Sequence, residues 1–160
     1  MHFKKSNDNQ STILHEGSVP YLTFKKLDQA GVRHGFSTRM GGVSEGMFST
    51  LNLSYNRGDK KEAVDENFRR ISEAIGFDHT KLVFSNQIHE TRIHKVTKED
   101  CGKVMKDMDG LATNEQGIPL YTGYADCVPL FFYDPVEKVA ALAHSGWRGT
   151  VGRIGAKMVR

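Results

Sequence analysis

Three side chains able to bind a metal ion stand at the ends of apolar stretches in this 160-residue chain. His89 closes VFSNQIH, Cys127 opens VPLFFY, and His144 closes VAALAH. Imidazole and thiolate are the ligand types that zinc prefers, and a catalytic zinc ion commonly has three protein ligands and one open position. A His2Cys set made of these residues would suit a catalytic metal ion.

The predicted hairpin that holds two of these residues places them close together. The apolar runs PLFFYD and VAALAHS flank a turn, and pairing of the two arms around residues 134–138 makes Cys127 and His144 near cross-strand neighbours. Directly opposed residues have Cβ atoms about 4.5–5.5 Å apart, which two ligands of one metal ion tolerate. His89 would add the third ligand from another strand.

Other uses of the same atoms remain open at this point. Cys127 and His144 could serve as nucleophile and base, with the thiolate activated by imidazole. A His2Cys set is also the ligand set of blue copper. A lone cysteine is often only a small buried hydrophobe. The residues alone leave these interpretations in competition.

Two arginines lie in glycine-containing motifs that suit an anion site. Arg39 stands in HGFSTRMGG, and Arg148 stands in HSGWRG, four residues after His144. A guanidinium donates in a fork that matches carboxylate or phosphate, although either arginine would also serve as a surface charge. Trp147 directly precedes Arg148. We expect its side chain to pack into the core rather than to form the floor of a substrate pocket.

The elements that must position these residues can be read along the chain. Residues 1–18 are polar and predict a flexible segment, and residues 19–160 predict one domain. Strands are expected in SVPYLTFKKL, GVRHGFST and KLVFSNQIHETRIHKV, and the glycine-rich stretch from Arg39 to Asp59 predicts a long loop.

Two helices are predicted. The first begins at a capping box of Asp59 and Glu62, carries an apolar stripe and ends at Gly76; the members of the stripe are Val64, Phe68, Ile71 and Ile75. The second begins at Thr150 and is amphipathic up to the last residue. A domain seldom ends inside such a helix, so a fragment of a longer protein is expected.

Composition excludes several classes of function. The net charge is +3 and the pI about 8.8, without dense basic blocks, which argues against nucleic-acid binding. No apolar stretch approaches the ~20 residues of a membrane span. The two cysteines do not form a secreted disulfide framework. A cytoplasmic location, with no membrane or nucleic-acid partner, is expected.

Five motifs together resemble the YfiH-type polyphenol oxidase (laccase-domain) family. They are GFSTRMGGVSEGMFSTLNLS, NQIHE, MDGLAT, YADCVPLFFYDP and AHSGWRGTVGRI, and they follow the family order from about residue 33 to residue 155. The family includes bacterial peptidoglycan editing factors and is similar to the catalytic domain of the human laccase-domain protein FAMIN. Its members are typically longer, which agrees with the expectation of a fragment whose C-terminal part is missing.

The resemblance implies an α/β (α+β) fold, a layered sandwich of mixed β-sheet with flanking helices. It also implies a zinc-dependent purine nucleoside phosphorylase, acting on adenosine, inosine or guanosine with phosphate, and adenosine deaminase activity alongside. Zinc would be held by His89, Cys127 and His144, with copper less expected. Cys127, His144 and Arg148 would be catalytic, and Arg39, Arg148 and Asn52 would contact substrate or phosphate.

One position departs from the family pattern, since Glu90 stands where glycine usually follows the histidine of NQIH. Its carboxylate is expected to narrow the pocket or to orient His89. Alternative functions are a peptidoglycan-precursor editing amidase that uses the same zinc or a Cys–His pair, and a copper polyphenol oxidase. Seven histidines without a His-x-His pair count against the multicopper alternative. A closed structural zinc site is disfavoured because the spare thiol, Cys101, lies in a charged loop.

Overall fold

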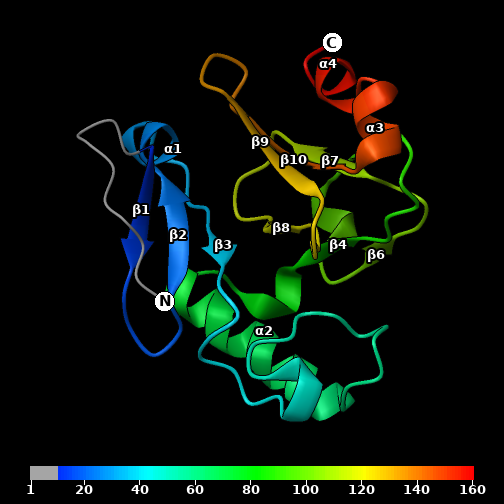
Figure 1. Ribbon diagram of the computed structural model, residues 1–160. Helices are drawn as coiled ribbons and strands as arrows, with labels where there is room; N and C mark the ends of the chain where they lie inside the picture. Colours follow the sequence, from blue (N-terminus) through cyan, green and yellow to red (C-terminus); the bar gives the residue numbers. More distant parts are fainter. Residues whose placement is uncertain (1–10) are drawn as a thin grey trace. The chain divides into compact units, whose positions relative to one another are not determined.

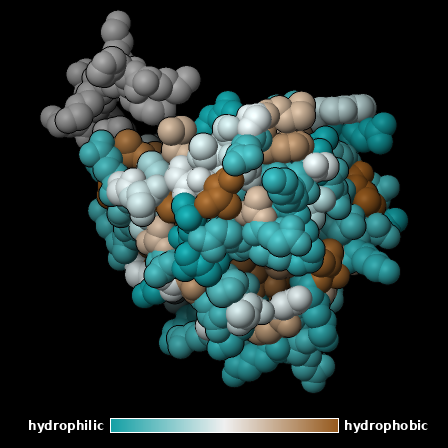
Figure 2. Space-filling view, turned by 90° about the horizontal axis from the view of Figure 1, so that it is seen from below, coloured by the Kyte–Doolittle hydropathy of each residue, from teal (hydrophilic) through white to brown (hydrophobic). Residues whose placement is uncertain are grey.

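The computed structural model describes residues 11–160, which form two compact units that divide between Gly76 and Phe77 (Figure 1). The predicted mixed α/β class is confirmed, because both units combine short helices with β-sheets. No helix in the described residues is long and apolar enough to cross a membrane. On the face shown in Figure 2, hydrophilic residues predominate and hydrophobic residues form separate small patches.

The first unit has a three-stranded antiparallel sheet in the order β1-β2-β3. Its elements are β1 (Thr12–His15), β2 (Tyr21–Phe24), α1 (Lys25–Gln29), β3 (Phe36–Ser37), the 3-10 turn η1 (Gly46–Phe48) and α2 (Lys61–Ile75). The predicted strands around residues 18–27 and 31–38 are present as β2 and β3. Strand β1 was not predicted; residues 1–10 of the segment expected to be flexible lie outside the described residues.

Helix α2 carries the predicted apolar stripe. Val64, Phe68 and Ile71 are buried, and Gly76 ends the helix in the left-handed conformation at φ 91°. The predicted capping box is wrong, because the N-cap is Lys60 and makes no side-chain cap bond. Asp59 instead accepts hydrogen bonds from the side chains of Ser44 (2.6 Å) and Asn52 (2.9 Å) and thereby braces the glycine-rich loop.

The second unit has two sheets. One is a mixed sheet in the order β5-β7-β10-β9, and the other is a parallel sheet in the order β6-β4-β8. The strands are β4 (Val83–Ser85), β5 (Ile93–Lys95), β6 (Val104–Met105), β7 (Gly110–Thr113), β8 (Leu120–Tyr121), β9 (Val128–Asp134) and β10 (Val139–Ser145). The helical segments are η2 (His79–Lys81), η3 (Lys98–Asp100), α3 (Trp147–Val151) and α4 (Ile154–Met158).

The C-terminal segment forms two short helices in place of the single predicted one. Helix α3 begins after Gly146, three residues before the predicted cap, and Arg153, at φ 59°, separates it from α4. Both helices contact β10 (Figure 1). The apolar face predicted for the single helix consists of Val151, Ile154 and Met158, and of these only Ile154 is fully buried, while Val151 is exposed. A residue in the left-handed region interrupts a helix, so one continuous stripe cannot form.

A buried cluster that includes Leu111 of β7 forms a core of the second unit, and its members are Val83, Val96, Leu111 and Ile118. Leu111→Ala is expected to lower the free energy of unfolding by about 2–5 kcal/mol, because the removed methyl groups leave a cavity at a fully buried site. Urea denaturation measures the change. Val136→Ala, at an exposed hairpin tip, should change it by less than about 0.5 kcal/mol; equal effects of the two variants would contradict the packing described here.

Candidate metal centre

His89, Cys127 and His144 converge in the second unit, and one ligand atom from each lies within 4.8 Å of the others. His89 comes from the loop between β4 and β5, Cys127 directly precedes β9, and His144 lies on β10. The two imidazole rings meet edge to face, with centroids 4.7 Å apart. His89 is exposed, Cys127 half-buried and His144 buried, so the cluster opens to solvent on one side.

The hairpin register differs by two residues from the predicted one. Asp134 pairs with Val139, so that His144 lies opposite Pro129, and the last pair is Ser145 with Val128. The turn is longer than predicted because the Asp134 side chain accepts hydrogen bonds from two turn amides and Lys138 adopts φ 54°. Cys127 therefore lies just beyond the ladder rather than opposite His144.

Gly146 borders the space between the three side chains. A Cβ atom at this position would lie 2.9 Å from Nδ1 of His89, 3.2 Å from Sγ of Cys127 and 3.4 Å from Cε1 of His144. Two imidazoles and a thiolate around one small space are a donor set that suits zinc. The residues present therefore fit a single bound metal ion.

The imidazole of His144 is held by a carboxylate that the sequence reasoning missed. Nδ1 of His144 lies 3.0 Å from Oδ1 of Asp109, which leaves Nε2 as the ring nitrogen that faces a metal. Asp109 directly precedes β7 and is fully buried. The available signal was its place in MDGLAT, an acid immediately before an apolar strand.

Gln87 links the loops that carry His89 and Cys127. Its side-chain amide donates to the Gly123 carbonyl (2.8 Å) and accepts from the Gly123 amide (2.9 Å). This paired contact joins residues far apart in sequence through both polar groups of one side chain. The two ligand-bearing loops are thereby held at a set spacing, a link that sequence reasoning also missed.

The surroundings of Cys127 raise the pKa of its thiol. Burial makes the largest contribution, and the charge and hydrogen bonding of the neighbouring Asp126 act in the same direction. A thiol with a raised pKa is a weaker nucleophile at neutral pH, since the thiolate is the reactive form. A cysteine that binds a metal ion is also a thiolate, so the raised pKa by itself does not distinguish a metal ligand from a nucleophile.

Tyr124 forms part of the wall beside His144, with ring centroids 5.8 Å apart. Its hydroxyl donates to the Ala143 carbonyl at 3.2 Å and lies 2.7 Å from the Thr122 hydroxyl. Burial raises the pKa of Tyr124 to about 12. Tyr124 therefore remains protonated at neutral pH and lines the site as a neutral group.

Arg148 and Trp147 lie on α3, directly after Gly146. The prediction that Trp147 packs into the core is wrong, because 73% of the residue is exposed. The Arg148 guanidinium carbon lies 5.3 Å from the Trp147 ring centroid, so that the indole packs against the cation. Both side chains are accessible to a ligand in solution.

Glu90 makes a different contact from the predicted one. Its carboxylate forms an exposed ion pair with Nε of Arg92 at 3.1 Å, and no hydrogen bond joins it to His89 in the described part of the chain. The contact that orients His89 is made by its own backbone, whose N–H donates to Asp109. Glu90 thus contributes its backbone amide, rather than its carboxylate, to the centre.

Arg39 and Asn52 belong to the first unit, where both line a hollow of about 270 Å³. Arg39 donates through Nε (3.1 Å) and Nη2 (2.7 Å) to the Ser49 carbonyl. The Asn52 amide donates to Asp59 and Ser54 within the loop. These bonds hold the loop in shape, and substrate contact by the two residues stays a prediction.

Comparison with known proteins identifies the family of this chain. The family model described as multi-copper polyphenol oxidoreductase laccase matches residues 33–160. The chain is 43% identical over 133 residues to "Purine nucleoside phosphorylase YlmD" of Bacillus subtilis, a match that covers 79% of this chain and 48% of that protein. It is 40% identical over 121 residues to "Purine nucleoside phosphorylase LACC1" of Mus musculus, which covers 74% of this chain and 27% of that protein.

Solved structures share the fold. The crystal structure of YlmD from Geobacillus stearothermophilus superposes with a TM-score of 0.84 at 36% identity, covering 92% of this chain and 57% of that one. The hypothetical protein YfiH of Bacillus licheniformis gives a TM-score of 0.82 at 38% identity, covering 87% and 54%. The chain spans about half the length of the bacterial relatives that it matches.

Proposed function

The chain belongs to the multi-copper polyphenol oxidoreductase laccase family, and we propose that it provides the zinc centre of a purine nucleoside phosphorylase. The observation that carries the proposal is the His2Cys cluster, in which three donor atoms lie within 4.8 Å of one another. Relatives in bacteria and mouse whose names state this activity support the choice of substrate. The substrates would be purine nucleosides, such as adenosine, inosine and guanosine, and phosphate.

His89, Cys127 and His144 would hold the metal through three protein ligands. Bound zinc supplies a Lewis acid that polarises an oxygen of substrate or water. The exposure of His89 leaves one side of the cluster open for a ligand, as in catalytic zinc sites. The same site would support deamination of adenosine as a second activity.

A cationic side chain of the second unit, Arg148, would bind the second substrate, phosphate. In phosphorolysis a phosphate oxygen forms a bond to the ribose C1′, the bond from C1′ to the purine nitrogen breaks, and the products are ribose 1-phosphate and the free base. Arg148 is exposed directly beyond Gly146 and would bind and orient the phosphate by paired hydrogen bonds. Arg39, which lines the hollow of the first unit, is proposed separately as a substrate contact within that unit.

The ligand count favours this reaction over multicopper oxidation. The part of the chain that the structure describes contains one group of three or more His, Cys, Asp or Glu side chains placed to hold a metal ion. This group consists of His89, Cys127 and His144. A multicopper centre would need ligands for several ions. A mononuclear site with an open side matches a hydrolytic or phosphorolytic reaction.

The test is to measure metal content and turnover on the same purified wild-type protein. We expect about one zinc ion per chain, because a site with three protein ligands binds one ion. Inosine should be converted to hypoxanthine and ribose 1-phosphate only when phosphate is present, as followed by 31P NMR. Adenosine assayed without phosphate should yield inosine by deamination. Zinc-free protein with full activity, or cleavage that needs no phosphate, would contradict the proposal.

A further inference from the structure

We propose that Asp109 is a positioning residue of the metal centre, whose carboxylate sets the tautomer of His144 and the backbone conformation at His89. The inference rests on the proposed metal site. It concerns how this chain prepares two ligands from separate segments for one ion. The evidence comes from the burial of Asp109, the donors that surround it, and the backbone geometry of the loop that carries His89.

Asp109 is buried without a cationic side chain to neutralise it. It is 0% exposed, and no lysine or arginine in the described residues forms an ion pair with it. A buried carboxylate is costly unless hydrogen bonds compensate for its lost hydration. Its burial beside a cluster of potential metal ligands therefore calls for a specific set of donors.

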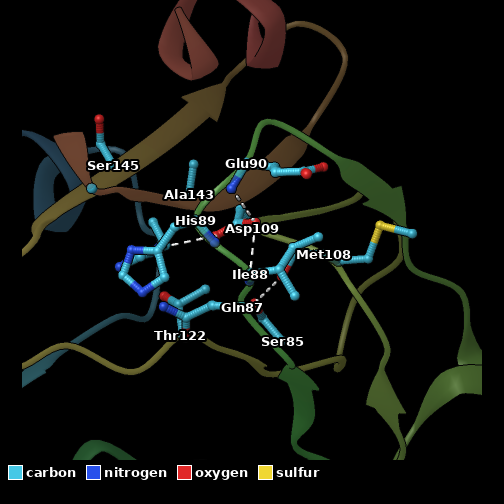
Figure 3. Close-up of polar contacts among 12 residues, drawn as sticks. Ser85, Gln87, Ile88, His89, Glu90, Met108, Asp109, Thr122, Ala143 and Ser145 are labelled. Atoms are coloured by element: carbon cyan, nitrogen blue, oxygen red, sulfur yellow. Dashed lines mark hydrogen bonds and ion pairs between the residues drawn. The ribbon is translucent and has the colours of Figure 1, made fainter. Parts of the chain in front are cut away.

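Four donors supply this compensation, two to each oxygen. Oδ1 accepts from the His89 amide (2.9 Å) and lies 3.0 Å from Nδ1 of His144, while Oδ2 accepts from the amides of Ile88 (3.3 Å) and Glu90 (2.9 Å). Figure 3 shows the loop of residues 87–90 beside the Asp109 carboxylate, with dashed lines between the carboxylate and the loop backbone. The carboxylate thus binds three successive backbone amides and one imidazole.

The backbone at His89 needs this support. Its φ of 61° is in the left-handed region, which a residue other than glycine seldom adopts. Successive N–H groups converge in such a conformation and create a small anion-binding concavity. Asp109 fills that concavity with an intramolecular anion, and the side chain of His89 is directed from this loop into the metal cluster.

The same carboxylate determines which nitrogen of His144 carries hydrogen. An ionised carboxylate is acceptor-only, and the two oxygens of Asp109 already accept three backbone N–H groups, so Nδ1 of His144 is the donor in this contact. In the neutral ring, Nε2 then keeps its lone pair, which is what a metal requires. The backbone reinforces the contact, because the His144 amide donates to the Asp109 carbonyl at 2.7 Å.

Asparagine cannot replace this carboxylate, although it has the same shape. An amide group offers one oxygen acceptor and one NH2 donor. If the NH2 faced His144 it would also face the His89 amide, and if it faced the other side it would meet the amides of Ile88 and Glu90. Either orientation opposes donor to donor, so Asp109→Asn isolates the electronic role of the carboxylate from its volume.

The experiment compares Asp109→Asn with Asp107→Asn, an identical change at an exposed position two residues away. Zinc affinity is measured by competition with a chromophoric chelator. We expect Asp109→Asn to weaken zinc binding by about 10–100-fold, the usual effect of losing a group that orients a metal ligand. Asp107→Asn should leave the affinity within about 2-fold of wild type, because its side chain lies outside this cluster.

A second readout needs neither zinc nor activity. Long-range 1H–15N NMR spectra of metal-free wild-type protein should show His144 as the Nδ1–H tautomer, and Asp109→Asn should shift it towards Nε2–H. An Nε2–H tautomer in the wild type would overturn the inference even if Asp109→Asn failed to fold. Unchanged affinity and tautomer in a folded Asp109→Asn would also overturn it. A wild type that binds no zinc would instead overturn the proposed metal centre itself, and the role of Asp109 with it.

Discussion

Cys127→Ala is expected to remove bound zinc and to lower kcat/KM for nucleoside phosphorolysis by at least about 10³-fold. Polarisation by a metal ion contributes several kcal/mol to a transition state, and each 1.4 kcal/mol corresponds to a factor of ten. Alanine leaves two imidazoles with no thiolate to complete the set. Elemental analysis and a steady-state assay on the same samples measure both effects.

The chain offers a matched control, because its second cysteine is free and half-buried as well. Cys101 packs against the core cluster around Val83 and Leu111 and lies outside the ligand group. Cys101→Ala should retain one zinc and near wild-type turnover. If the wild-type protein were active without metal, and this activity were lost in Cys127→Ala, the thiol would be a nucleophile. That result would contradict the zinc mechanism.

Gly146→Ala is expected to lower turnover by about 10²-fold and to reduce zinc content while the protein stays folded. The added methyl group would lie 2.9 Å from His89 Nδ1 and 3.2 Å from Cys127 Sγ, so that one of these donors must move. A misplacement of roughly 1 Å at a reactive site has an effect of this size. Zinc analysis, turnover and far-UV circular dichroism measure the three quantities.

The backbone at Gly146 makes this a steric test. Its φ of −69° and ψ of 173° are open to alanine, so the substitution introduces no backbone strain. Gly155→Ala serves as the control, since its new methyl group would meet only Leu130 Cδ1, at 3.4 Å. If Gly146→Ala kept full zinc content and turnover, the donors would not share the space described here.

The ligand cluster could be predicted because it depends on the positions of the three residues relative to nearby apolar strands. Each of the three residues ends an apolar stretch, and the antiparallel hairpin brings Cys127 and His144 to one end of the sheet. The register was wrong by two residues, since it depends on the side-chain bonds of Asp134 and on the positive φ of Lys138. A register shift of two residues keeps side chains on the same face of a strand. The predicted proximity of Cys127 and His144 is therefore correct although the predicted register is not.

The supporting contacts were beyond sequence reasoning because they join distant segments. Asp109 lies 35 residues from His144 and Gln87 36 residues from Gly123, and neither pair follows a helical or strand period. The position of Trp147 was wrong for a related reason. An indole beside apolar strands suggests core packing, but the start of α3 at this residue directs it to solvent.

The two hydrogen bonds between the Gln87 side chain and the Gly123 backbone bear on metal selectivity. Loops joined by two hydrogen bonds lose their conformational entropy when the chain folds, so little remains to be lost when an ion binds. A flexible donor set adapts its geometry and follows the intrinsic affinity order of divalent metals, in which copper exceeds zinc. In the proposed zinc centre a rigid trio would impose its own angles instead, and we expect these to suit an ion that accepts tetrahedral coordination without electronic penalty, as zinc does.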